Sequence, residues 1–282
     1  MHRVIDPHIH LFNQAQGDYH WLKSENAPFW PDKKYLCQDF SESNLAAGPE
    51  VEVAGFVHIE AGFDNEAPWR ELEWLEAHCN RPFRSIAFVD LTRSDFLRHL
   101  HLLEQHISLV GIRFILDDHA EEYLSNPRVQ ENLAYIAERG LLFEAQLPLS
   151  DTLSVDALRA VLQVMPELQV VVNHAGFFQA DNFDWKHSIS KLAELAGCSI
   201  KCSGWEMLNR QWDLEAIKPA ITHIIAQFGS ERVMLASNFP VSDLGCSYRE
   251  LWARYMFGLQ IPEELRSKLT FKNAQRIYRL DI

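Results

Sequence analysis

The chain has 282 residues, of which 47% are apolar and 23% are charged. This length and balance exclude a disordered or fibrous protein and are typical of a folded protein that buries a sizeable core. The formal net charge is −13. Because an acidic chain repels phosphate backbones, we do not expect nucleic acid as a partner.

The sequence also carries signals about compartment. The N-terminus has no apolar stretch of the kind found in secretory signals, and no apolar run approaches the about 20 residues that span a bilayer. Five cysteines, an odd number, show no C-x-x-C spacing. These features predict a cytoplasmic protein with reduced thiols and no membrane partner, and they leave a homo-oligomer open.

Short apolar runs rich in β-formers alternate with longer amphipathic segments. The expected strands cover residues 4–10, 53–60, 84–90, 110–116, 141–146, 169–174, 199–203 and 233–237. The expected helices cover residues 66–79, 95–106, 127–138, 155–164, 185–196, 214–228, 248–257 and 262–279. Asn126 before Pro127 is a helix N-cap followed by proline at the first helical position. Strict alternation of strand and helix predicts a parallel sheet with right-handed crossovers.

Eight such units in this length predict a closed (β/α)8 TIM barrel, formed by residues 1–282 as a single domain. The alternative is an open doubly wound sheet, but no G-x-G-x-x-G follows the first strand. The loop after that strand, about residues 11–40, is unusually long, and loops of this length are usually functional. We expect it to form a lid in which Tyr19 and Trp21 close over a substrate. The alternative is a packed plug without ligand contact.

The first strand ends in Asp6-Pro7-His8-Ile9-His10. Since alternate side chains of a strand share a face, Asp6, His8 and His10 are expected to point toward the barrel axis. Two imidazoles two residues apart can bind one metal ion or polarise one carbonyl group. His174 ends another apolar strand and adds a third imidazole at the same rim. The alternative is a polar cluster that is satisfied by hydrogen bonds within the protein.

Other strand ends carry polar side chains that could contact a substrate. Arg113 lies inside an apolar strand, where a guanidinium is costly to bury unless an anion or several acceptors meet it. We expect Arg113 to bind a substrate carboxylate or hydroxyl groups, with pairing to Glu144 or Glu60 as the alternative. Glu60 and His58 share a face at the end of the second strand. Gln146 ends the fifth strand and is expected to bind the substrate by hydrogen bonds.

Taken together, these motifs resemble the amidohydrolase superfamily, and within it the TIM-barrel branch of sugar-lactone and 2-pyrone-4,6-dicarboxylate hydrolases. The resemblance runs nearly from end to end of the chain. The first-strand D-x-H-x-H, the fourth-strand G-I-R, the sixth-strand N-H-x-G and the eighth-strand S-x-F-P-V carry it, at Asp6, His8, His10, Gly111, Ile112, Arg113, Asn173, His174, Gly176, Ser237, Phe239, Pro240 and Val241.

The resemblance implies a hydrolase whose small-molecule substrate is a sugar-acid or dicarboxylate lactone. It implies that His8, His10 and His174 bind a divalent metal ion, Zn²⁺ or Mn²⁺, or contact the substrate carbonyl directly if no metal is present. The sequence does not decide between metal binding and direct contact with the carbonyl. A decarboxylase on the same scaffold and a ligand-binding relative without turnover are the alternative functions.

One position departs from the family pattern. The family normally has aspartate where this chain has Asn238, and there the aspartate binds metal or activates water. A neutral amide cannot accept a proton near pH 7 and therefore cannot act as a general base. Its oxygen can still contact a metal, or orient water and a substrate carbonyl, so we retain Asn238 among the catalytic candidates. Glu60 is the nearest candidate for a base that replaces the missing carboxylate.

Overall fold

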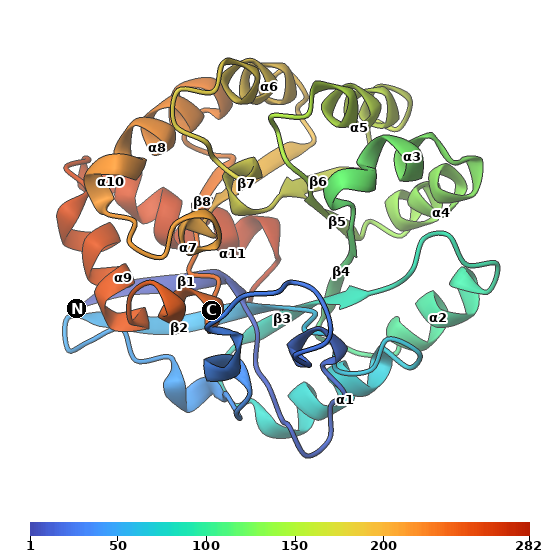
Figure 1. Cartoon of the computed structure of the whole chain (residues 1–282), viewed down its shortest axis with the longest axis horizontal. Helices are drawn as coiled ribbons and strands as arrows, with labels where there is room; N and C mark the ends of the chain where they lie inside the picture. Colours follow the sequence, from blue (N-terminus) through green and yellow to red (C-terminus); the bar gives the residue numbers. More distant parts are fainter.

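The computed structural model describes residues 1–282 and contains one sheet of eight strands in the order β1 to β8 (Figure 1). The strands are β1 His2–Ile9, β2 Val51–Ile59, β3 Phe83–Phe88, β4 Leu109–Ile115, β5 Leu142–Gln146, β6 Gln169–Val172, β7 Cys198–Cys202 and β8 Val233–Leu235. All neighbouring pairs are parallel. A parallel bridge between Ile9 and Phe239, which follows β8, brings the two edges together. The predicted barrel is confirmed.

Helices surround the sheet. They are α1 Trp69–His78, α2 Phe96–Leu103, α3 Ala120–Ser125, α4 Pro127–Glu138, α5 Thr152–Val164, α6 Phe183–Ala193, α7 Trp205–Leu208, α8 Leu214–Phe228, α9 Tyr248–Ala253, α10 Glu263–Ser267 and α11 Asn273–Ile277. The expected N-cap is present, because the Asn126 side chain accepts from the N–H of Arg128. The short helices α3 and α7 were not expected from the sequence, since four to six residues carry too little periodicity. No helix is both long and apolar enough to cross a bilayer.

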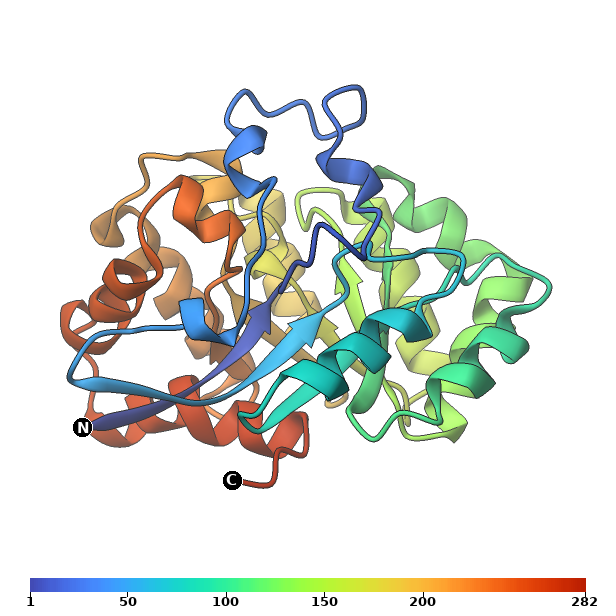
Figure 2. The same cartoon turned by 90° about the horizontal axis from the view of Figure 1, so that it is seen from below.

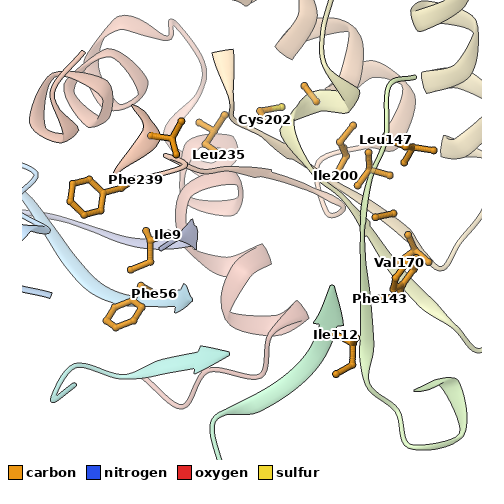
Figure 3. Close-up of a cluster of buried hydrophobic side chains, with 14 of the residues drawn as sticks. Ile9, Phe56, Ile112, Phe143, Leu147, Val170, Ile200, Cys202, Leu235 and Phe239 are labelled. Atoms are coloured by element: carbon orange, nitrogen blue, oxygen red, sulfur yellow. The ribbon is translucent and has the colours of Figure 1, made fainter. Parts of the chain in front are cut away.

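Alternation along the strands separates an apolar outer layer from a polar interior. Side chains such as Ile112, Phe143 and Ile200 belong to the large apolar cluster that the strands share with the helices (Figure 3). The residues that directly follow these three on their strands are Arg113, Glu144 and Lys201. Because successive strand side chains point to opposite faces, these three charged groups face the inside of the barrel.

A second apolar cluster closes the lower end of the barrel. It joins inward side chains of the strands to the C-terminal segment and consists of Ile5, Val57, Ile59, Ile86, Val110, Leu142, Val171, Met234, Ala274, Tyr278 and Leu280. The C-terminal helices that contribute to it lie beneath the strands, in red at the bottom of Figure 2. This apolar floor leaves the carboxyl ends of the strands as the place where polar groups gather.

The first strand contains an irregularity that corrects one expectation. The pairing of β1 with β2 shifts register after Asp6. The Asp6 carboxylate accepts main-chain N–H groups of His8 and Ser237 and lies beside Tyr248 of α9. The sequence predicted that Asp6 shares a face with His8 and His10. This prediction is wrong, because the bulge interrupts the two-residue period between Asp6 and the histidines. Burial raises the pKa of Asp6 to about 6.

The long segment between β1 and β2 lies over the carboxyl ends of the strands, at the top of Figure 2. Its short 3₁₀ turns are His20–Leu22, Lys33–Leu36 and Glu42–Asn44. The buried Lys33 ammonium donates to the main-chain oxygens of Trp21, Lys23 and Asn26 at 2.9, 2.8 and 2.7 Å. Three charge-assisted hydrogen bonds therefore hold the segment in one compact arrangement above the polar end of the barrel.

Candidate active site

Three imidazoles meet at the polar end of the barrel. The ring centroid of His8 lies 4.5 Å from that of His174 and 5.1 Å from that of His10. Burial lowers the pKa of each ring well below its ordinary value. The positive charge of Arg113 lowers all three pKa values further, and that of Lys201 lowers those of His8 and His174. All three rings are therefore neutral at pH 7, and the structure brings the three histidines together as the sequence predicts.

Hydrogen-bond partners assign different tautomers to the two rings of β1. His10 Nδ1 lies 2.8 Å from the main-chain oxygen of Ile59. A carbonyl can only accept, so Nδ1 carries the hydrogen and Nε2 presents a lone pair. His8 Nδ1 lies 3.3 Å from the Lys201 ammonium, which can only donate. His8 therefore carries its hydrogen on Nε2, and this buried Nε2 has no partner in the protein. Neighbouring rings thus present one acceptor and one donor.

The position of His174 depends on a close approach to the segment after β7. His174 Nδ1 lies 3.1 Å from the Ser203 hydroxyl oxygen. The next residue, Gly204, has φ +71°, and a Cβ there would lie 2.7 Å from His174 Nδ1. Both the left-handed backbone and the lack of space require glycine at this position.

Lys201 was not identified from the sequence. Its ammonium is fully buried and donates to Glu144 Oε2 at 2.8 Å, while the Tyr278 hydroxyl donates to Glu144 Oε1 at 2.5 Å. Burial lowers the pKa of Lys201 to about 8, against the opposite effect of Glu144. The group is therefore mainly charged at pH 7. The signal that could have found it is the one used for Arg113, a cation in the middle of an apolar strand.

Arg113 pairs with Glu60, not with Glu144. Its Nε and one terminal nitrogen lie 2.8 and 2.7 Å from Glu60 Oε1, and that terminal nitrogen also donates to the Glu60 main-chain oxygen. The other terminal nitrogen has only a long contact, 3.4 Å, with Gln146 Oε1. Glu60 is thus the counter-ion of Arg113, which corrects its expected role as a free base. The Gln146 amide nitrogen donates to Asp117 at 3.0 Å, so both its polar atoms have partners.

Tyr19 and Trp21 use their polar atoms within the first loop. The Tyr19 hydroxyl accepts the Asn13 N–H at 2.7 Å, and the side chain is 1% exposed in the apolar core. The indole of Trp21 donates to the main-chain oxygen of Ala61 at 2.8 Å. These contacts assign Tyr19 to the packing of the loop, which corrects the expectation that it closes over a substrate. Trp21 remains partly exposed.

The missing carboxylate at position 238 has a counterpart on another element. Asn238 Nδ2 donates to Glu206 Oε1 at 2.6 Å, and Glu206 lies on α7. The second carboxylate oxygen, Oε2, is buried without a partner. Burial raises the pKa of Glu206 to about 7, although the hydrogen bond from Asn238 opposes this shift. Glu206 was missed because its four-residue helix carries no periodic pattern that would place it.

The comparisons with known proteins agree with this architecture. A family model described as amidohydrolase matches residues 5–280. The chain belongs to the amidohydrolase family. This amidohydrolase is 30% identical over 302 residues to an uncharacterized protein of Sinorhizobium fredii, and the match covers 98% of each chain.

One further relative and one solved structure are informative. This amidohydrolase is 23% identical over 287 residues to an L-fucono-1,5-lactonase of Burkholderia ambifaria, covering 98% of this chain and 96% of the relative. A solved amidohydrolase of Burkholderia multivorans with bound zinc has a TM-score of 0.80, at 19% identity over 99% of each chain. At 19% identity, the likeness to this solved structure establishes the fold alone.

The side chains of this amidohydrolase do not form the expected metal site. No group of three or more histidine, cysteine, aspartate or glutamate side chains is arranged to hold a metal ion. His8 carries its hydrogen on Nε2, and the cations Lys201 and Arg113 face the imidazoles. Positive charges at close range oppose a divalent ion. The donor set of His8, His10 and His174 therefore does not fit the expected Zn²⁺ or Mn²⁺ ion in this arrangement.

The raised pKa of Glu206 predicts a pH-dependent effect of its replacement on stability. In the folded state the carboxyl titrates near pH 7, above its ordinary value of 4.5. The contribution of the Glu206 carboxyl to the stability of the folded protein is therefore fully present below its unfolded-state pKa. This contribution is lost as the pH rises through the folded-state pKa. Glu206→Gln should raise the melting temperature relative to the native protein more at pH 8 than at pH 5.

Thermal unfolding at both pH values, followed by circular dichroism, measures this difference. The exposed Glu121→Gln is the matched control. An equal change in melting temperature at pH 5 and pH 8 for Glu206→Gln would show that burial does not raise the pKa of the Glu206 carboxyl.

Proposed function

We propose that this amidohydrolase hydrolyses a small lactone, of sugar-acid or dicarboxylate type, by adding water to the carbonyl carbon. The observation that carries the proposal is the pairing of a buried, unpartnered donor with an adjacent acceptor, His8 Nε2–H and His10 Nε2. Ester hydrolysis needs both groups, one for the oxygen that gains charge and one for the proton of water. The likeness to an L-fucono-1,5-lactonase supports the same assignment.

In this proposal His10 acts as the general base. Its Nδ1–H is held by the main-chain oxygen of Ile59, which aims Nε2 away from the β1–β2 backbone. Because burial keeps the ring neutral by lowering its pKa, Nε2 is free to take a proton from water as the oxygen attacks the lactone carbon. The ring C–O bond then breaks, and the imidazolium of His10 returns the proton to the departing oxygen. The product is the open hydroxy acid.

His8 stabilises the negative charge that develops on the carbonyl oxygen. Its Nε2–H is buried and has no competing acceptor in the protein. The Lys201 ammonium on the other side of the ring favours the tautomer with hydrogen on Nε2. A donor that is already oriented in a dry site needs no reorganisation as the reaction proceeds, which is the basis of oxyanion stabilisation.

The position of Arg113 favours a substrate that carries carboxylate or hydroxyl groups. Its charge is anchored by Glu60, whereas one terminal nitrogen has only the long contact with Gln146. That nitrogen offers N–H groups to a carboxylate or hydroxyl of the lactone. A sugar-acid or dicarboxylate lactone supplies such groups on the same small ring.

The proposal predicts that His10→Asn abolishes most turnover. Asparagine can still donate to the Ile59 oxygen but lacks the basic nitrogen corresponding to Nε2. We expect kcat to fall by about 10²–10⁴-fold, the usual contribution of a general base. The measurement is acid release from a panel of sugar 1,4- and 1,5-lactones and 2-pyrone-4,6-dicarboxylate, followed with a pH indicator.

The exposed histidine of α2 provides a matched control, His101→Asn, with no expected effect. Incubation of the native protein with a chelator should leave acid release unchanged, since the donor set does not fit a metal. Native-level kcat in His10→Asn, or release of carbon dioxide in place of the hydroxy acid, would contradict the proposal.

A second prediction concerns Arg113. Arg113→Lys keeps a positive charge beside Glu60 but removes the planar array of donors. Loss of one hydrogen bond to a charged or polar substrate group should raise KM by about tenfold to a hundredfold. Steady-state kinetics on the best lactone of the panel test this, with Arg128→Lys on α4 as control. An unchanged KM would remove Arg113 from the substrate site.

A further inference from the structure

The backbone of Asn238 is fixed beside the histidine cluster. Its N–H donates to the main-chain oxygen of His8 at 2.9 Å, and its own oxygen accepts the N–H of Ser242 at 3.1 Å. The residue has φ +70°, a left-handed conformation that asparagine tolerates better than most side chains. The short side chain of Asn238 is therefore held next to His8 and can turn only about its own side-chain bonds.

The orientation of the Asn238 amide is decided by Glu206. The ionised Glu206 carboxylate, the form present above its raised pKa of about 7, can only accept, so in that form Nδ2 faces Glu206 Oε1, at 2.6 Å. The amide oxygen Oδ1 then points the other way and accepts no hydrogen bond within the protein. Without the carboxylate the amide could turn over and present a donor in the same place. Glu206 therefore determines whether position 238 offers an acceptor or a donor.

Glu206 has no other side chain that explains its burial. The nearby Arg210 guanidinium binds Asp32 at 2.7 Å and reaches only the main-chain oxygen of Glu206. Glu206 Oε2 has no hydrogen-bond partner at all. The other ionisable groups facing it are Asp243, Cys246 and Tyr255. A buried carboxylate with one amide partner costs stability, so packing does not account for it.

We propose that Glu206 is a positioning residue that holds the Asn238 amide with Oδ1 toward the substrate, where it accepts a hydrogen bond from the attacking water. This inference rests on the proposed lactone hydrolysis. The water then donates one hydrogen to Asn238 Oδ1 and the other to His10 Nε2, which directs its oxygen lone pair at the lactone carbon. No proton is transferred to Asn238, and its amide remains neutral throughout.

The first experiment exchanges the two groups. In Glu206→Gln the new amide can donate or accept, so the Asn238 orientation is released; kcat should fall about tenfold to a hundredfold with KM within twofold. Asn238→Asp places two carboxylates in contact and should lower kcat similarly. When both substitutions are combined, the introduced amide on α7 donates to the introduced carboxylate after β8. The acceptor oxygen is then restored, and kcat should recover to within about threefold of the native value.

A purely structural role predicts a different result for this cycle. The effects of the two substitutions would then multiply in the double variant, as they do for independent sites. Recovery therefore supports a functional pair, and multiplied losses overturn it. A kcat in Glu206→Gln equal to the native value also overturns the proposal, while acid release by the native protein would leave lactone hydrolysis intact.

The second experiment does not need turnover. In protein labelled with ¹⁵N at asparagine side chains, the Asn238 amide signal is the one absent from Asn238→Asp. The short bond to a carboxylate should shift one of its protons strongly downfield, and Glu206→Gln should move that signal back. An unmoved signal overturns the proposal. If the signal moves but the native protein releases acid from no lactone, the proposed function fails and the positioning of the amide stands.

Discussion

A buried ammonium group in the middle of the barrel determines the state of the side chains around it. Lys201 lies between Glu144 and His8, with its nitrogen 2.8 Å from the carboxylate and 3.3 Å from the ring nitrogen. Because the ammonium can only donate, His8 must accept on Nδ1 and carry its hydrogen on Nε2. Burial lowers the pKa of His8 and His174 and keeps both rings neutral, and the positive charges of Lys201 and Arg113 act in the same direction. The donor of the proposed reaction, His8 Nε2–H, follows from this arrangement, and the main-chain oxygen of Ile59 fixes the acceptor on His10.

The ammonium is tolerated because the fold supplies its counter-charge from distant parts of the chain. Glu144 comes from β5, and the hydroxyl that completes its hydrogen bonds belongs to Tyr278, which follows α11. Tyr278 also belongs to the apolar floor of the barrel. Removing one partner of such a buried pair costs about 3–5 kcal/mol, because the other charge is left unpaired. The C-terminal segment is thus part of the support of the site as well as of the core.

Much of this could be predicted from the sequence, because alternation of strand and helix and the position of polar residues at strand ends are local properties. The barrel, the three histidines and the buried Arg113 all follow from them. The side of Asp6 could not, since a bulge breaks the two-residue period without changing the residue pattern. The sequence also could not predict which side chains pair across the barrel. Glu60 and Glu144 were both candidates for Arg113, and their spacing in the sequence does not distinguish them. Glu206 depends on a four-residue helix that has no sequence signature.

The absence of a carboxylate at position 238 looks from the sequence like the loss of a catalytic group. In the folded protein, Glu206 brings a carboxylate within 2.6 Å of the Asn238 side chain from a different element. A substitution at a motif position is therefore not evidence of lost activity when the fold places a compensating group beside it. A carboxyl group is retained beside this position, but it comes from a different element of the fold.

The tautomer of His8 tests the central role of Lys201 most directly. In protein labelled with ¹⁵N at histidine, the ring nitrogen shifts at pH 7 distinguish the two neutral tautomers and the imidazolium, and the His8 signals are those lost in His8→Asn. If Lys201 determines the tautomer, His8 is a neutral ring with hydrogen on Nε2 and a lone pair on Nδ1. A ring protonated on Nδ1, or an imidazolium at pH 7, would contradict it.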